Sequence, residues 1–107
     1  MNEADFLKSV IDLAHAYKWK VIHFRSALRK DGTYQTPVQG DGVGFPDLIL
    51  VRERVIFAEL KSETGKISEA QVEWITALNV ATQEKMSGGN TYIWRPSDWD
   101  QIVEILK

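Results

Sequence analysis

Two acidic residues and one lysine stand at the ends of stretches that are otherwise apolar. Asp47 directly precedes the run Leu48–Val51, and Glu59 and Lys61 close the run that begins at Val55. An ionised side chain costs several kcal/mol to remove from water unless it is paired or binds a metal ion. We therefore interpret these three residues as a candidate functional site.

The side chains of this set are the kind that bind a hard divalent cation. Mg²⁺ and Mn²⁺ prefer carboxylates, backbone carbonyls and water, so Asp47 and Glu59 are candidate ligands and the Leu60 backbone carbonyl is a candidate third ligand. Lys61 is placed to orient a water molecule or to neutralise charge on a phosphate oxygen. The reaction class that this set favours is phosphodiester hydrolysis. The alternative is a buried ion network of the same three side chains without catalysis.

The length of the loop at residues 52–54 decides whether the two carboxylates meet. A three-residue loop pairs Val51 with Val55 and, further along, Asp47 with Glu59, with Cβ atoms roughly 4.5–5.5 Å apart. A two-residue loop would place the two acids on opposite faces, because a slip of one residue inverts every side chain. We predict the three-residue loop.

Hydrophobic periodicity predicts an α/β fold. Both faces of the hairpin are apolar, which is typical of strands covered on both sides. The expected order is α-β-β-β-α-β-α, a four-stranded sheet flanked by helices in one domain over residues 1–107. Its expected elements are a helix over 2–17, a strand over 19–28, two strands between 42 and 61, a helix from 69 to about 84, a strand over 91–94 and a helix after Pro96-Ser97. Residues 29–44 are predicted to form a loop.

Two polar residues, Gln71 and Glu3, are candidates for the site, although the position of each at the start of a helix is enough to explain its residue type. Ser68 and Gln71 form a capping box at the start of a helix that is expected to bury Val72, Ile75 and Leu78. Glu3 lies in the first turn of the first helix, where the helix dipole favours an acid.

The charge distribution is more informative than the net charge of −2. Between Asp12 and Asp31 the sequence has no acidic residue but several basic ones: His15, Lys18, Lys20, His23, Arg25, Arg29 and Lys30. This segment is either a solvated edge strand protected by its charges or a surface that faces phosphate. We interpret His23 as a half-exposed strand residue.

Other classes of protein are excluded or disfavoured by composition. The absence of cysteine excludes a disulfide framework and a thiolate zinc site. No apolar run of about 18 residues exists, so we expect no membrane partner and an intracellular location. Gly40, Gly42 and Gly44 lead into a strand rather than a helix, so no nucleotide cofactor is expected. Small residues there are suited to let a substrate backbone approach Asp47.

The motifs GVGFPDLILV and FAELKSETGKISEAQVEWI resemble the VRR-NUC family of the PD-(D/E)xK nuclease superfamily. The resemblance covers nearly the whole chain and implies a restriction-endonuclease-like core with a mixed sheet. It implies that Asp47 and Glu59 bind the metal ion, that Lys61 is the catalytic lysine, and that Gln71 and Glu3 match the family's helix glutamine and first-helix acid. Stand-alone members, found in phages and bacteria, are similar in fold to Holliday-junction resolvases, which implies a homodimer.

The function hypothesis is a Mg²⁺- or Mn²⁺-dependent DNA endonuclease that acts on duplex DNA or on branched, flap or junction DNA. Arg25, Arg29 and Lys30 are expected to contact backbone phosphates. The alternative is a nucleic-acid-binding module that keeps the nuclease fold without catalysis. The family also includes the nuclease domain of a DNA-repair enzyme.

Overall fold

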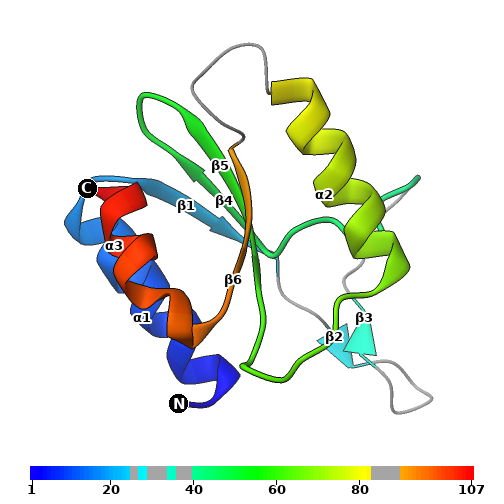
Figure 1. The fold of residues 1–107 in the computed structure, drawn as a ribbon, viewed down its shortest axis with the longest axis horizontal. Coiled ribbons are helices and arrows are strands. Elements are labelled where there is room, and N and C mark those ends of the chain that lie inside the picture. The colour runs from blue at the N-terminus through cyan, green and yellow to red at the C-terminus, as the bar shows by residue number, and fades with distance from the viewer. Residues whose placement is uncertain (25–26, 29–33, 36–39, 83–89) are drawn as a thin grey trace.

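The computed structural model describes residues 1–24, 27–28, 34–35, 40–82 and 90–107 (Figure 1). The described helices and strands run in the following order: α1 (Glu3–Ala16), β1 (Lys20–His23), β2 (Ala27–Leu28), β3 (Tyr34–Gln35), β4 (Leu48–Val51), β5 (Val55–Leu60), α2 (Glu69–Thr82), β6 (Thr91–Trp94), the 3₁₀ turn η1 (Pro96–Asp98) and α3 (Trp99–Leu106).

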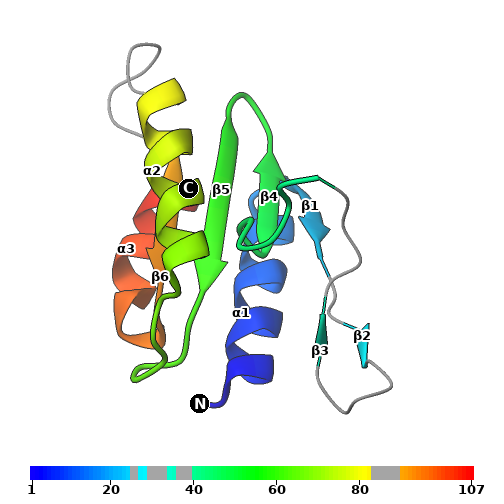
Figure 2. The same cartoon turned by 90° about the vertical axis from the view of Figure 1, so that its right-hand side faces the viewer.

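The main sheet is mixed, as predicted. Its strand order is β1-β4-β5-β6, in which β1 and β5 are each antiparallel to β4, and β6 is parallel to β5. Strands β2 and β3 pair with each other in a separate two-stranded sheet, which lies beyond the end of β1 (Figure 2). The single strand predicted over 19–28 is therefore wrong in its length, and part of the predicted loop at 29–44 forms β3. Strand β1 ends early because its partner β4 begins only at Leu48.

One face of the sheet carries the core. Helices α1 and α3 lie side by side over it (Figure 1), and Asn2 caps α1 by accepting from the Asp5 N–H at 2.8 Å. The sheet residues that face these helices are fully buried: Leu48, Leu50, Ile56, Ala58 and Leu60. This layer accounts for most of the apolar burial that holds the described chain together.

The opposite face of the sheet is only partly covered, by α2. An aromatic cluster fastens this helix to the sheet, because the Phe45 ring meets those of Phe57 and Trp74 edge to face, with centroids 5.9 and 5.0 Å apart. Val51 and Val55 nevertheless keep 38% of their surface exposed. The prediction that the hairpin is covered on both sides is wrong for this end of it.

The helix predicted over 69–84 begins where the capping box places it, but it buries less than expected. Val72 is 51% exposed rather than buried, and Ile75 and Leu78 are half-buried. The reason is that α2 packs on the sheet along a narrow strip next to Phe45 and β6. The last residues of the predicted helix, from 83 on, lie outside the described residues.

The hairpin has the predicted three-residue loop. Val51 pairs with Val55 and Leu48 with Ala58, and the Arg52 N–H donates to the Arg54 carbonyl at 3.0 Å. Two arginines of this loop are bound to carbonyl groups at helix ends: Arg52 donates to Tyr17 and Leu106, and Arg54 donates to Ile105. Carbonyl groups at a helix C-terminus lack partners within the helix, so the loop arginines satisfy them.

Gly44 brings the chain before β4 against the start of α2. Its φ is +87°, and a Cβ atom there would lie 2.6 Å from the Ala70 carbonyl carbon. The expectation that small residues here admit a substrate backbone is wrong for Gly44, because α2 itself occupies that space. Among the described residues, no helix is long and apolar enough to cross a membrane.

Gly44→Ala should destabilise the protein more than Gly40→Ala does. Both glycines have positive φ, but a Cβ at Gly40 would meet nothing within 4 Å. Gly40→Ala should cost about 1–2 kcal/mol of unfolding free energy, and Gly44→Ala should cost at least about 1 kcal/mol more, because backbone must move. Urea unfolding of the two variants measures the difference; equal costs would contradict the contact with Ala70.

Candidate active site

The hairpin register brings the two acids together. Extending the observed pairing by one step places Asp47 opposite Glu59 at the end of the sheet. The Asp47 carboxylate accepts from the Leu60 N–H at 3.0 Å, and the Lys61 Nζ lies 3.7 Å from Glu59 Oε2. The three side chains predicted from sequence thus form one cluster.

Gln71 serves the helix end and the acid cluster at once. Its Oε1 accepts from the Ser68 N–H at 2.9 Å, and its own N–H is bound to Ser68 Oγ at 3.2 Å. The side-chain amide nitrogen of Gln71, Nε2, donates to Glu59 Oε2 at 3.0 Å. The two explanations of Gln71 therefore do not compete: the cap fixes the amide so that its N–H₂ group faces the carboxylate.

The Glu59 carboxyl is buried in an environment that disfavours its ionised form. It is only 3% exposed, and burial together with the Asp47 charge raises the pKa of Glu59 to about 8, while Lys61 opposes the shift. Its Oε1 is buried and has no hydrogen-bond partner among the described residues. An unpartnered oxygen in such a place is typical of a group whose partner is a proton or a cation.

The residues present fit a Mg²⁺ or Mn²⁺ ion. In the described parts of the chain no group of three His, Cys, Asp or Glu side chains could hold a metal. The two carboxylates that meet here, Asp47 and Glu59, are those that would hold the ion. Mg²⁺ is commonly held by one or two carboxylates while it keeps several waters. The Leu60 N–H faces Asp47, and the carbonyl of the same residue remains the candidate third ligand.

A small pocket opens beside Asp47. It has a volume of about 190 Å³ and is lined by Glu3, Ala4, Leu7, His23, Asp47 and Leu60. Glu3 therefore lines the same pocket as Asp47. Among the described residues, however, Glu3, Asp47 and Glu59 do not form a group of three that could hold one metal ion. The structure also places His23 in this pocket, which the sequence interpretation left out of the site. This position follows from the pairing of β1 with β4, in which His23 lies opposite Leu48, the neighbour of Asp47, and the sequence carries no local signal for it.

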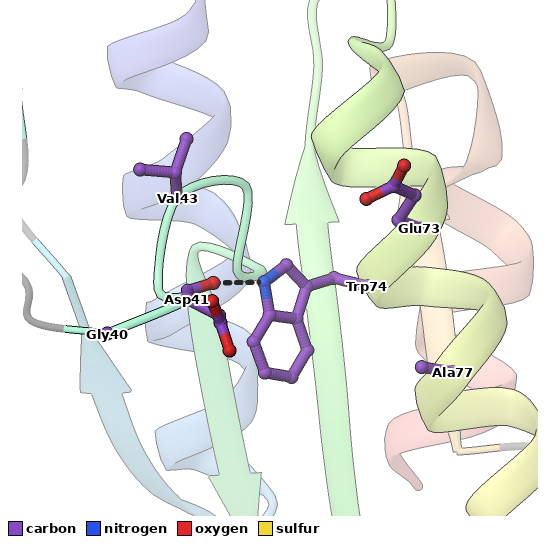
Figure 3. A pocket seen from close by; sticks show the side chains of 6 residues that line it. All are labelled: Gly40, Asp41, Val43, Glu73, Trp74 and Ala77. Atoms are coloured by element: carbon purple, nitrogen blue, oxygen red, sulfur yellow. Dashed lines mark hydrogen bonds between the residues drawn. The ribbon is translucent and has the colours of Figure 1, made fainter.

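A larger pocket lies beside Trp74, on the α2 side of the segment that precedes β4 (Figure 3). It has a volume of about 530 Å³ and lies between α2 and the segment before β4, lined by Gly40, Asp41, Val43, Glu73, Trp74 and Ala77. The Trp74 indole N–H donates to the Asp41 carbonyl at 2.9 Å and so ties the two sides together. Among the described residues its lining includes two acids, Asp41 and Glu73, and no cation, a charge balance that disfavours phosphate.

The predicted phosphate contacts Arg25, Arg29 and Lys30 lie outside the described residues. The arginines of the hairpin loop do not replace them. Arg52 and Arg54 are bound to helix-end carbonyls, and their guanidinium groups lie close to the Trp19 ring, at 4.4 and 5.6 Å from its centroid.

A comparison with protein families gives one finding. A family model described as the VRR-NUC domain matches residues 16–89, a range that contains Asp47, Glu59, Lys61 and Gln71 but not Glu3. No curated protein and no solved structure gave a match.

Metal-free protein should lose stability as pH rises from 4.5, the usual pKa of Glu59, to about 8. The folded state keeps the Glu59 proton over this window and the unfolded state releases it, so the unfolding free energy falls with pH. Glu59→Gln should flatten this slope, whereas Glu73→Gln, which changes an exposed glutamate, should not. Urea unfolding in the presence of a chelator measures the slopes. An unchanged slope in Glu59→Gln would contradict the assignment.

Proposed function

The chain belongs to the VRR-NUC domain family, a nuclease family of the PD-(D/E)xK type, and we propose that it is a Mg²⁺- or Mn²⁺-dependent DNA endonuclease. The observation that carries the proposal is the meeting of Asp47, Glu59 and Lys61 at one end of the sheet. A purely structural ion network would be expected to satisfy its carboxylate oxygens, whereas Glu59 Oε1 has no partner among the described residues.

Each residue has a separate role in this proposal. Asp47 and Glu59 hold the cation, which, when bound, lowers the pKa of water and offsets phosphate charge. Glu59 keeps its orientation because Gln71 donates to one of its oxygens and leaves the other free. The Lys61 ammonium group, next to Glu59 Oε2, orients the attacking water or stabilises charge on the phosphate.

The DNA lies, in this proposal, across the end of the sheet where the pocket beside Asp47 opens. Glu3 and His23 line that pocket, so Glu3 assists at the edge of the metal site and His23 faces the substrate there. Arg25, Arg29 and Lys30 contact backbone phosphates, which position the DNA without reading its sequence. In this proposal the protein acts on branched, flap or junction DNA, which it selects by shape rather than by base sequence.

We also propose that the protein works as a homodimer. The support is the partly uncovered face of the sheet, on which apolar side chains remain accessible: Ile22, Val51, Val55 and Ile93. Exposed apolar residues on a sheet face are typical of protein–protein contacts. Two copies that bury part of this face would bring two metal sites into one particle.

Purified protein should cleave plain, flapped or four-way DNA when Mg²⁺ or Mn²⁺ is present and should not do so with a chelator. Asp47→Asn and Glu59→Gln should each lower the cleavage rate by about a hundredfold or more, because each removes a charged ligand. The matched controls Asp41→Asn and Glu73→Gln change exposed acids away from the cluster and should leave the rate unchanged.

Two results would contradict the proposal. One is a protein that cuts none of these substrates, and the other is an Asp47→Asn variant that cuts as well as wild type. DNA binding with a steep salt dependence but no metal-dependent turnover would support the alternative of a binding module on a nuclease fold.

Ile22→Glu should convert the dimer to a monomer in sedimentation experiments, because it places a charge on the exposed apolar face. Val80→Glu is the matched control, since Val80 is also exposed but lies on α2 rather than on the sheet. A wild-type protein that sediments as a monomer at high concentration, or a dimer that Ile22→Glu leaves intact, would be inconsistent with this interface.

A further inference from the structure

The chain leaves the sheet at Lys61, and the segment that follows is held by residues beyond β6. Strand β5 ends at Leu60, so Lys61 is one residue past the last regular strand position. Its N–H donates to the Trp94 carbonyl at 2.9 Å. Arg95, which follows Trp94 in the chain, donates from Nη1 to the carbonyls of Ser62 and Glu63 at 2.5 and 3.2 Å.

The contact between these two segments is reciprocal. The Glu63 carboxylate accepts from the Ser97 N–H at 2.5 Å, while Arg95 uses its own N–H to bind Asp98 Oδ2 at 2.8 Å. Arg95 is thereby fixed at the start of η1, and its side chain reaches across to the backbone that directly follows Lys61. Hydrogen bonds from a charged donor to backbone carbonyls are stronger than neutral ones.

This arrangement matters because a lysine at the end of a strand has no regular structure beyond it to fix its backbone. The side chain of Lys61 is only 17% exposed and its Nζ lies 3.7 Å from Glu59 Oε2. Displacement of a catalytic group by about 1 Å can lower a rate by roughly a hundredfold. A mobile segment at residues 61–63 would therefore spoil the geometry of the cluster even with Asp47 and Glu59 in place.

We infer that Arg95 is a positioning residue for Lys61: it fixes the backbone after the lysine so that the ammonium group stays beside Glu59. The inference rests on the proposed nuclease function for its catalytic consequence. The role differs from a phosphate contact, because Nη1 of Arg95 is bound to two backbone carbonyls and the side chain is partly buried.

The test is Arg95→Met, with Arg54→Met as the matched control. Like Arg95, Arg54 donates to a backbone carbonyl, that of Ile105, and it also donates to Asn90. These contacts lie at the opposite end of the sheet. Arg95→Met should lower kcat by about tenfold to a hundredfold and leave the KM for DNA unchanged. Arg54→Met should lower thermal stability without changing kcat. Arg95→Lys, which keeps one charged donor, should restore part of the lost kcat.

A double-mutant cycle shows whether Arg95 acts through the lysine. In a Lys61→Met background, adding Arg95→Met should cause no further loss of activity, since the group that Arg95 positions is already absent. Losses that multiply would overturn the inference, as would a rise in KM with kcat unchanged, which would indicate a DNA contact.

Hydrogen exchange separates this inference from the proposed function, because it needs no activity. The amide protons of Lys61 and its neighbours should exchange faster in Arg95→Met than in wild type, while those of β4 keep their protection. Unchanged exchange at Lys61 would overturn the inference even if the protein is a nuclease. Wild-type protein that cleaves no DNA would overturn the proposed function instead and would not alter the exchange result.

Discussion

The candidate site is organised around the burial of one carboxyl group next to another. Glu59 lies almost fully inside the protein, with Asp47 across the hairpin, and both effects raise the pKa of Glu59 to about 8. Two carboxylates in a poorly solvated place repel each other. The partners of Glu59 within the chain, Gln71 and Lys61, do not remove that repulsion completely. The Lys61 ammonium group contributes one positive charge at 3.7 Å. In the proposed function a divalent cation would supply the rest of the compensating charge.

The surrounding elements can be understood as the means of keeping this arrangement in place. The three-residue loop fixes which residues of β4 and β5 face each other, and its arginines bind the ends of α1 and α3. The capping box of α2 holds the Gln71 amide against Glu59. Gly44 lets the start of the same helix approach the chain before Asp47. A change far along the sequence can thus alter the site through any of these contacts.

Much of this could be predicted from the sequence, because it depends on local rules. The number of loop residues between Val51 and Val55 determines the register, and the Ser68 and Gln71 pair determines where α2 begins.

The remaining features depend on contacts between distant segments. The pocket position of His23, the bonds of Arg95 and the contact of Gly44 with Ala70 follow only from the packed arrangement. Strands β2 and β3 have two residues each, too short to leave a periodic signal. Apolar character on both faces of the hairpin suggested full cover, but an apolar residue can remain exposed.

The most direct test of the central claim is a calorimetric titration of metal-free protein with Mn²⁺, because it measures cation binding without reference to any DNA substrate. Wild-type protein should bind the ion with release of the Glu59 proton at a pH below 8, seen as a dependence of the heat on the ionisation enthalpy of the buffer. Glu59→Gln should bind far more weakly and release no such proton. Equal affinity in the two proteins, or no binding by wild type, would contradict the assignment of Asp47 and Glu59 as a metal site.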